Sequence, residues 1–468
     1  MYRPVTALLF GAGQRGAEVY GPYALMNAEA LQFVAVAEPD TLRRRKFAID
    51  HNIPEERQFT SWEDALSEGK LADVVFNCTQ DDMHYASGMA ALNVGYDMLL
   101  EKPMANRLSD TVRLVQSAEE NGRLIQVCHV LRYTDFFQKV REIIGSGRLG
   151  QLINISHNEN VSAWHMAHSF VRGNWRSESA SSPMILAKCC HDLDLIQWVV
   201  HSRVRHLSSF GSLLHFKSEN KPTGAPSRCT DGCPVEESCP FYAPMLYIDL
   251  QPIKHALRNA RDPLFRIGGW MAQNTPSLTV ALANVLPPAR ELSEYSGWPR
   301  STISDEPGNI DALWNALETG PFGRCVYSCD NDVVDHQLVC MAFENGVTAT
   351  LTMHGHSHEE GRTLRIEGSQ ATLLGKFSFN QTYLEVSDHR GDRRDRNEFP
   401  NQVERGGHGG GDQVLVGDFI EVIRGKAQAR TDARDSLESH LLAFAAEVSR
   451  HEKKVINMEI FRQQVEQM

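Results

Sequence analysis

The chain has 468 residues, more than a single ordinary hydrophobic core organises, so we expect two or three domains. Its 42% apolar and 23% charged residues are typical of a globular protein and exclude a disordered chain. Asp and Glu number 59 against 47 Lys and Arg, a net charge of -12, so the surface repels phosphate backbones and nucleic acid is not an expected partner.

The first apolar stretch, at residues 5–10, is too short for a signal peptide and runs directly into a glycine turn. No apolar run in the sequence approaches the ~20 residues of a membrane span, so membrane association is not expected. We therefore interpret residues 5–10 as a buried β-strand and expect the protein to be cytoplasmic.

Short apolar runs alternate with helical patterns up to residue 128. The predicted strands are 5–10, 33–37, 74–78, 97–100 and 124–128, and helices are expected at 17–25 and 109–121. This alternation is typical of a parallel, doubly wound sheet buried on both faces. We predict an N-terminal dinucleotide-binding (Rossmann) domain over residues 1–128 and a second domain over residues 129–468.

A glycine-rich turn, Gly11-Ala12-Gly13-Gln14-Arg15-Gly16, follows the first predicted strand and opens a helix. In a dinucleotide-binding turn the first glycine allows the bend, the second lets the pyrophosphate approach the backbone, and the third lets the helix pack on the strand. The phosphates then lie on free N–H groups of the helix N-terminus. We expect Gly11, Gly13, Gln14, Arg15 and Gly16 to contact the cofactor.

An acidic residue, Glu38, follows the second predicted strand about twenty residues after the turn, as the dinucleotide-binding fingerprint requires. Its carboxylate would accept hydrogen bonds from both ribose hydroxyls, which favours NAD. Arg43 and Arg44 lie close enough to meet a 2′-phosphate, so NADP is the alternative cofactor.

The fifth predicted strand ends in Glu101-Lys102-Pro103. A lysine at the carboxyl end of a parallel strand faces the crevice in which such sheets bind ligands. The proline that follows this lysine restricts the backbone of the lysine. The peptide bond between them can also be cis, which would fix the direction of the lysine side chain.

Three sequence stretches together resemble the Gfo/Idh/MocA family (glucose-fructose oxidoreductase, inositol dehydrogenase and MocA): the glycine turn, Glu101-Lys102-Pro103 and residues 188–194, Lys-Cys-Cys-His-Asp-Leu-Asp. The turn at 79–84, Thr-Gln-Asp-Asp-Met-His, is also similar to that family's loop after the fourth strand. The resemblance implies a Rossmann domain followed by an α+β domain with a large, mostly antiparallel open sheet. That second domain would bind substrate and form a homo-oligomer, with a cysteine-containing insertion at about 215–330.

By this resemblance Lys102 is the general acid/base for a substrate hydroxyl, and His191 polarises it or relays its proton. Thr79, His84, Glu101 and Lys102 itself would line the cofactor site, and Asp194 would contact substrate. Sugar dehydrogenases of the family commonly place Asp four residues before this histidine, where Ala187 stands here. Lys188, which replaces a small residue, is then a further catalytic candidate.

Other substrate candidates lie within the second predicted domain. Residues 164–176 concentrate aromatic rings, His and Arg, which suit polyhydroxylated rings through stacking and forked hydrogen bonds; the alternative is an ordinary surface loop. A second group follows the last Rossmann strand. The candidates are Trp164, His165, His168, Arg172, Trp175, His129, Arg132 and Tyr133.

Ten cysteines are too sparse for a disulfide scaffold, but Cys229, Cys233 and Cys239 are clustered with spacing compatible with a metal. Structural zinc needs a fourth ligand, which Cys189 or Cys190 would supply. An iron–sulfur cluster and three reduced cysteines in a proline-rich loop are the alternatives.

These patterns predict an NAD(P)-dependent oxidoreductase that transfers hydride to or from a sugar, cyclitol or related polyol. The missing Asp and the extra lysine also fit a glycosidase that oxidises a sugar transiently, eliminates the aglycone, adds water and reduces the sugar again with the same NAD. A non-catalytic, NAD-sensing regulator is a third hypothesis, which Lys102 and His191 argue against because a sensor needs neither proton donor.

Overall fold

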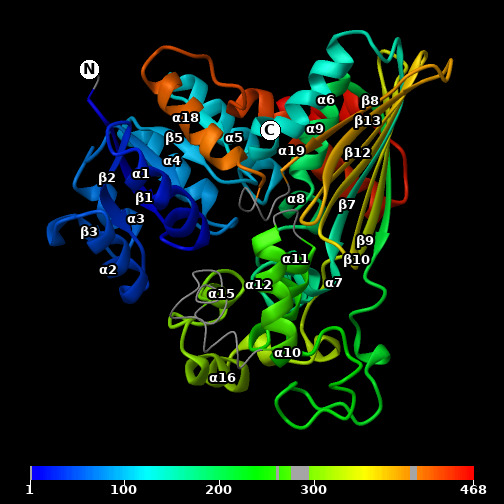
Figure 1. The fold of residues 1–468 in the computed structure, drawn as a ribbon. Helices are drawn as coiled ribbons and strands as arrows, with labels where there is room; N and C mark the ends of the chain where they lie inside the picture. The colour runs from blue at the N-terminus through cyan, green and yellow to red at the C-terminus, as the bar shows by residue number, and fades with distance from the viewer. Residues whose placement is uncertain (1–2, 260–262, 276–294, 401–407, 468) are drawn as a thin grey trace. The chain divides into compact units, whose positions relative to one another are not determined.

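The computed structural model describes residues 3–259, 263–275, 295–400 and 408–467 of the chain, as drawn in Figure 1. These residues form two compact units. The first comprises Met1–Phe137, Ala180–Leu207 and Gly410–Met468, and the second comprises Gln138–Ser179 and Ser208–Gly409. The chain therefore returns to its N-terminal unit twice after leaving it.

A six-stranded parallel sheet forms the centre of the first unit, in the order β3-β2-β1-β4-β5-β6. The strands are β1 (Val5–Phe10), β2 (Leu31–Ala37), β3 (Gln58–Phe59), β4 (Val74–Asn77), β5 (Asp97–Leu100) and β6 (Ile125–Val127). The chain winds in opposite directions on either side of the β1/β4 pair, which is the switch point at which such sheets bind ligands. The predicted doubly wound domain is confirmed.

Helices connect these strands. They are η1 (Gln14–Tyr20), α1 (Gly21–Met26), α2 (Thr41–Asp50), α3 (Trp62–Ser67), α4 (His84–Val94) and α5 (Leu108–Glu120). Two of them begin at capping side chains: the Asp40 carboxylate accepts from the N–H of Arg43, and the Ser61 hydroxyl accepts from that of Asp64. The helix predicted at 17–25 differs in kind, since η1 is a π-helix that passes into α1.

The two returning segments complete the core of the first unit. They carry α8 (Met184–Ala187), α9 (Cys190–Val200), α18 (Gly411–Ile423), α19 (Ala433–Glu452), β15 (Ile456–Asn457) and α20 (Met458–Glu466), while η3 (Val130–Tyr133) follows β6. Helix α19 packs against both α5 and α9. The edge of β6 is covered as well, because Val127 and Thr431 exchange hydrogen bonds of 2.7 Å.

The second unit is built on a large, open mixed sheet (Figure 1), in the order β14-β13-β12-β11-β7-β10-β9-β8. Its strands are β7 (Leu152–Ser162), β8 (Val204–Ser212), β9 (His336–Phe343), β10 (Thr348–Ser357), β11 (Gly361–Gly368), β12 (Ala371–Ser378), β13 (Thr382–Asp388) and β14 (Arg394–Phe399). Only β7 and β10 are paired in parallel among the pairings described for this sheet, as expected for a mostly antiparallel sheet. Strand β8 starts in the first unit, where β15 pairs with its residues His206 and Leu207.

The remaining elements of the second unit are helices. They are α6 (Asp135–Gly145), which begins in the first unit, α7 (Ala163–His165), η4 (Met166–Arg172), η5 (Ser218–Asn220), α10 (Ala243–Tyr247), α11 (Gln251–Arg258), α12 (Pro263–Asn274), α15 (Arg300–Ile303), α16 (Ile310–Thr319), η6 (Pro321–Gly323) and η7 (Val326–Ser328). Part of this segment has its own apolar core, in which Tyr247 and Leu317 are fully buried.

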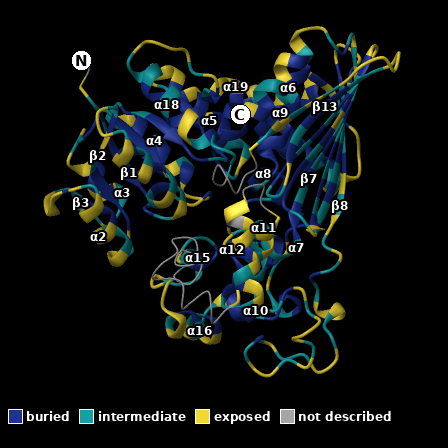
Figure 2. Cartoon of the chain, viewed as in Figure 1, coloured by how far each residue is buried: buried dark blue, intermediate teal, exposed yellow. Residues whose placement is uncertain are grey.

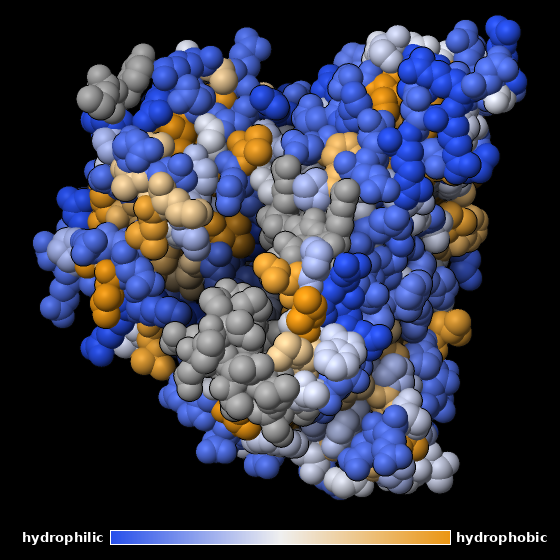
Figure 3. Space-filling view, in the orientation of Figure 1, coloured by the Kyte–Doolittle hydropathy of each residue, from blue (hydrophilic) through white to orange (hydrophobic). Residues whose placement is uncertain are grey.

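Burial follows the strands and the central helices, while exposed residues are concentrated on connections and outer helix faces (Figure 2). The surface drawn in Figure 3 is mainly hydrophilic, with hydrophobic residues in separate groups. Among the described helices, none combines the length and the apolar character that crossing a bilayer requires.

Candidate active site

The glycine turn after β1 has the geometry that a bound pyrophosphate needs. Gly11 adopts φ +84°, and a Cβ there would lie 2.6 Å from the carbonyl oxygen of Cys78. A Cβ at Gly16 would lie 2.2 Å from the carbonyl oxygen of Gly11, so only glycine lets the helix approach the turn. By contrast, a Cβ at Gly13 would meet no atom within 4 Å. The turn is closed on its inner side and open at Gly13, which is the side that a ligand would occupy.

Glu38 stands directly after β2 and is buried beside this turn. Its carboxylate accepts hydrogen bonds from the N–H of Ala12 at 2.7 Å and from that of Asp40 at 2.9 Å. Arg44 donates to the carbonyl oxygen of Glu38 rather than pointing a free fork at the site. The acid therefore lies where a ribose would follow the pyrophosphate.

Arg15 contacts two carboxylates in the first unit. Its guanidinium lies 2.5 Å from Glu101 and 2.5 Å from Asp412, and the Tyr20 hydroxyl donates to Glu101. Burial alone would raise the pKa of Glu101, but Arg15 and the Tyr20 hydroxyl outweigh it, so the pKa is lowered. Arg15 thus holds the Glu101 carboxylate ionised. Sequence reasoning did not single out Asp412 or Tyr20 for this network.

The loop after β4 is tied to the peptide that follows Lys102. The Thr79 hydroxyl donates to Oδ1 of Asn77 at 2.8 Å, at the end of β4. The His84 ring faces the carbonyl oxygen of Pro103 through Nδ1 at 2.6 Å and that of Thr79 through Nε2 at 3.1 Å. These contacts fix the two loops that flank the switch point. Gln14 is exposed at the start of η1.

Lys102 extends from the carboxyl end of β5, and its peptide bond to Pro103 is cis. Its Nζ donates to the carbonyl oxygen of Ala187 at 2.6 Å. The side chain is half-buried, so the ammonium is held without being sealed from solvent. Lys188, the next residue after Ala187, is half-buried as well.

A group of imidazole rings lies close to Lys102. The His129 ring lies 5.6 Å from that of His191 and 5.8 Å from that of His440, measured between centroids. The charge of Lys102 acts on both His129 and His440. His191 is the second residue of buried helix α9, and His129 follows β6, so adjacent parallel strands and the returning segment bring the group together. His440 carries no signal in the sequence that marks it for this position.

Two of these histidines are held in the neutral form. Burial, with the charge of Arg132 and Lys102, lowers the pKa of His129 well below its usual value. Burial, with His129, lowers the pKa of His440 to about 3. The Nε2 of His440 accepts from the N–H of Met104 at 3.0 Å, so its Nδ1 donates to the carbonyl oxygen of Ser436 at 2.8 Å.

Arg132 and Asp194, both substrate candidates from the sequence, are buried and paired with one another. The guanidinium of Arg132 makes a forked contact with the carboxylate, with Nε 2.7 Å from Oδ2. The neighbouring Tyr133 hydroxyl contacts Gln126, Thr431 and Asp418 instead. This ion pair lies beside His129, whose Nε2 is 3.9 Å from Oδ1 of Asp194, and it helps to fix the position of the histidine group.

The remaining substrate candidates lie in the second unit. His165 contacts Glu360 through Nδ1 at 2.9 Å, and buried His168 contacts the Tyr247 hydroxyl at 3.0 Å. Trp298 packs against both rings and against Trp164, and Phe170 packs against Trp175. The segment that carries these residues is a short α-helix, α7, followed by the π-helix η4.

The cysteines are divided between the units. Cys189 and Cys190 are buried at the start of α9 in the first unit, and the charge of Lys102 acts on Cys190. Burial raises the pKa of the Cys190 thiol to about 12. The three clustered cysteines of the sequence lie in the second unit together with Cys325.

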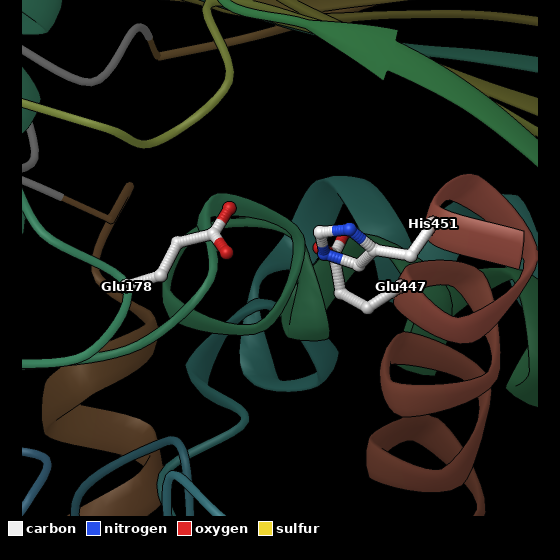
Figure 4. A group of neighbouring side chains, drawn as sticks. All are labelled: Glu178, Glu447 and His451. Carbon is white, nitrogen blue, oxygen red and sulfur yellow. The ribbon is translucent and has the colours of Figure 1, made fainter.

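Figure 4 draws a different group with metal-ligand atoms, Glu178, Glu447 and His451. Glu447 and His451 lie one turn apart on α19, with Nε2 3.6 Å from Oε2, and Arg450 also pairs with Glu447. Glu178 belongs to the second unit, so the first unit itself supplies only two ligands. We assign no metal site to this group.

Two sequence families match the chain. Residues 5–129 match the family described as "Oxidoreductase family, NAD-binding Rossmann fold", and residues 137–227 match the "GFO/IDH/MocA C-terminal domain". The first match covers the glycine turn, Lys102 and His129, and the second covers His191.

Individual relatives are distant. YteT of Bacillus subtilis is 21% identical over 395 residues, 81% of this chain and 78% of that protein. Inositol 2-dehydrogenase of Salmonella typhimurium is 24% identical over 159 residues, 34% of this chain and 44% of that protein. A solved structure of an oxidoreductase from Agrobacterium radiobacter, in complex with NAD+, L-tartaric acid and magnesium, is 14% identical with a TM-score of 0.63. That likeness covers 97% of this chain and 99% of that one, and it extends the shared fold over both units.

Proposed function

Because the chain belongs to the Gfo/Idh/MocA family of NAD-binding oxidoreductases, we propose that it transfers hydride between a nicotinamide cofactor and a hydroxyl-bearing carbon of a sugar, cyclitol or related polyol. One observation carries this proposal. Lys102, with the imidazole group beside it, ends a strand at the same carboxyl edge of the parallel sheet as the glycine turn.

The residues present fit a dinucleotide. Open space at Gly13 and the closed contacts of Gly11 and Gly16 suit a pyrophosphate lying on the turn, and the Glu38 carboxylate suits the ribose hydroxyls. We propose NAD as the preferred cofactor, because a carboxylate repels a 2′-phosphate, with NADP as the alternative. Arg15 is engaged by two carboxylates, so its part is to hold the turn against Glu101. A nicotinamide cofactor bound there would supply the acceptor or the donor of the hydride.

Lys102 is the proposed proton-transfer group. In the oxidative direction the substrate C–H bond breaks with its electron pair, the O–H bond breaks, and the carbonyl double bond forms. A neutral Nζ of Lys102 takes the hydroxyl proton, and in the reverse direction the ammonium returns it. The carbonyl oxygen of Ala187 orients Nζ. His191 is proposed to polarise the hydroxyl or pass its proton onward, and Lys188 to add positive charge nearby.

The substrate class rests on the chemistry of Lys102 and on relatives such as inositol 2-dehydrogenase. His129 is proposed to line the substrate side of the site, and Arg132 and Asp194 to position it. The aromatic, imidazole and guanidinium groups of residues 164–176, which belong to the second unit, stay predicted substrate contacts. Self-association through its open sheet, a cytoplasmic location and a structural zinc ion stay predictions; the zinc ligands are taken up below.

The test is spectroscopic. Purified full-length protein is incubated with NAD+ or NADP+ and a panel of cyclitols, aldoses and sugar acids, and absorbance of the reduced cofactor is followed with product analysis. Reduced cofactor that accumulates in proportion to a ketone or lactone product supports the proposal. Aglycone release from a glycoside without net reduced cofactor would instead assign the recycling glycosidase, and cofactor binding without turnover of any polyol would favour a sensor.

A further inference from the structure

Four cysteines of the second unit, Cys229, Cys233, Cys239 and Cys325, line one narrow hollow. Its volume is about 20 Å³, room for roughly one water-sized sphere. Cys229 and Cys325 are buried, and Cys233 and Cys239 are half-buried. We call these four residues the thiol cluster. Three were predicted to act together from their spacing, but Cys325 is distant in the sequence.

Backbone hydrogen bonds bring the two cysteine-bearing segments into register. The N–H of Cys229 donates to the carbonyl oxygen of Gly323 at 2.8 Å, and that of Cys325 donates to Ser227 at 2.9 Å. Arg228 and Arg324 form an isolated antiparallel bridge between them. Residues 221–242 otherwise contain no helix or strand. A segment without regular structure normally needs another constraint to stay ordered.

A buried positive charge faces the thiol cluster. Arg172 ends η4, is fully buried and lines the same hollow. Its Nε donates to the carbonyl oxygen of Arg324 at 2.7 Å, one Nη2 bond reaches that of Phe241 at 2.7 Å, and another reaches Sγ of Cys229 at 3.5 Å. The guanidinium therefore joins three segments of chain.

This guanidinium has no anionic partner in the part of the chain that the structure describes. Its bonds are to two carbonyl oxygens and a thiol, the Tyr247 hydroxyl lies beside it, and Nη1 has no partner in hydrogen-bond geometry. Buried charges are normally paired. The cysteine sulfurs line the same hollow, and they would carry the compensating negative charge once a metal ion binds them as thiolates.

We propose that Cys229, Cys233, Cys239 and Cys325 bind one soft divalent metal ion, zinc in particular, as a structural centre whose negative charge pairs with Arg172. Zinc in structural sites is held tetrahedrally by four cysteine thiolates, a set that carries two net negative charges with the ion. The fourth ligand is then Cys325 and not Cys189 or Cys190, which belong to the first unit. Binding releases the thiol protons to solvent and changes no oxidation state.

The size of the hollow distinguishes a single ion from a cluster. Four Zn–S bonds of ~2.3 Å place sulfurs about 3.8 Å apart. The cysteine sulfurs are not within 4.8 Å of one another as a group of three or more in the described chain, so binding would draw them inward. Rotation of side chains on the irregular segment accomplishes this, whereas a four-iron cluster would need a hollow larger than about 20 Å³.

The direct test is the metal content of the intact protein. Inductively coupled plasma mass spectrometry of full-length protein, dialysed without chelator, is expected to give about one zinc per chain. Cys229→Ser and Cys325→Ser are expected to lose most of it. The matched control is Cys340→Ser, because Cys340 is a half-buried cysteine on β9 outside the cluster, and its zinc content should equal wild type. Arg172→Met is expected to weaken zinc binding by about 10–100-fold, as loss of groups that surround ligands does.

A measurement on the wild-type chain guards against variants that fail to fold. After chelation, Co²⁺ is added, and the visible bands and sulfur charge-transfer absorption of tetrahedral cobalt thiolate are expected at one equivalent. Full zinc content in Cys325→Ser with loss in Cys190→Ser would overturn the ligand set. Iron with acid-labile sulfide would overturn the single ion. Absence of metal and of a cobalt–thiolate spectrum, or disulfides among the four cysteines, would overturn the centre altogether.

Discussion

The ammonium of Lys102 donates to the backbone carbonyl oxygen of Ala187, 2.6 Å away. Ala187 occupies the position at which sugar dehydrogenases resembling this chain commonly carry an Asp. A backbone carbonyl thus orients the lysine here, and no side chain at position 187 reaches it as an acid. Since a carbonyl accepts but does not ionise, the contact positions Nζ without adding a titrating group.

Lys102→Met should abolish the proton transfer and leave the cofactor site in place. We expect kcat to fall by about 10²–10⁴-fold, the usual contribution of a general acid/base. The dissociation constant of NADH, measured by fluorescence, should change little, because methionine keeps the length of the side chain. Lys46→Met is the matched control: Lys46 is exposed on α2, and its loss should leave both quantities unchanged. Normal turnover by Lys102→Met would remove Lys102 from the mechanism.

Gly13→Ala and Gly16→Ala form a matched pair that separates binding from folding. A Cβ at Gly13 meets nothing in the protein, so Tm should stay the same while the affinity for NADH falls by about tenfold or more. A Cβ at Gly16 would lie 2.2 Å from the Gly11 carbonyl oxygen, so that variant should lose about 1–3 kcal/mol of stability. Thermal unfolding and NADH titration check both. Unchanged affinity in Gly13→Ala would move the pyrophosphate off the turn.

Glu38→Gln tests the preference for NAD. The carboxylate charge is lost while one oxygen is kept to accept from the N–H of Ala12. Hydrogen bonds to a charged group are worth about 1.5–3 kcal/mol, so the ratio of NAD to NADP affinity should fall by about 10–100-fold. Glu18→Gln, an exposed glutamate on η1, removes the same charge at a neighbouring position and should leave the ratio unchanged. A ratio that does not move in Glu38→Gln would contradict the proposed ribose contact.

The parallel sheet was predictable from the sequence because strands buried on both faces read as continuous apolar runs, and the glycine turn marks the first of them. β1 and β5 have the bounds that the sequence predicts, 5–10 and 97–100. The cofactor side of the site follows from this local order, since the carboxyl ends of successive parallel strands meet at one edge.

The wall of the site was less predictable because it depends on contacts distant in the sequence. His440 accepts from Met104, 336 positions away, and α19 reaches that place only by packing on α5 and α9. Arg132 and Asp194 were each expected to contact substrate. The sequence shows that each of these residues carries a charge, but it does not show that they pair with each other in the folded chain.

That ion pair predicts a specific pattern of stability. Removing one partner leaves a buried, uncompensated charge, so Arg132→Met and Asp194→Leu should each lose about 3–5 kcal/mol of unfolding free energy. The double variant should be more stable than the sum of the two losses implies, because no charge is left unpaired. Urea unfolding of the four proteins measures the coupling. Additive losses would show that the pair does not act as a unit.

Stability should fall with acid through His440 and His129. The folded-state pKa of His440 is lowered to about 3 from 6.5, and that of His129 is also lowered, so the unfolded chain binds protons that the folded chain excludes. The stabilisation from His440 is complete above about pH 6.5 and is lost as pH falls toward 3, by about 1.4 kcal/mol per pH unit, and the lowered pKa of His129 acts in the same direction. In the folded chain, a proton on Nε2 of His440 would face the N–H of Met104.

Urea unfolding between pH 7 and 5 measures how the free energy of unfolding changes with pH. His440→Gln should lower that slope by the contribution of one proton, about 1.4 kcal/mol per pH unit. Glutamine presents an oxygen to the N–H of Met104 but does not titrate, so its own loss of stability at pH 7 should shrink as pH falls. The control is His451→Gln, since His451 is largely exposed near the end of α19. A slope that is the same in wild type and His440→Gln would show that His440 is protonated in the folded protein, contrary to its two hydrogen bonds.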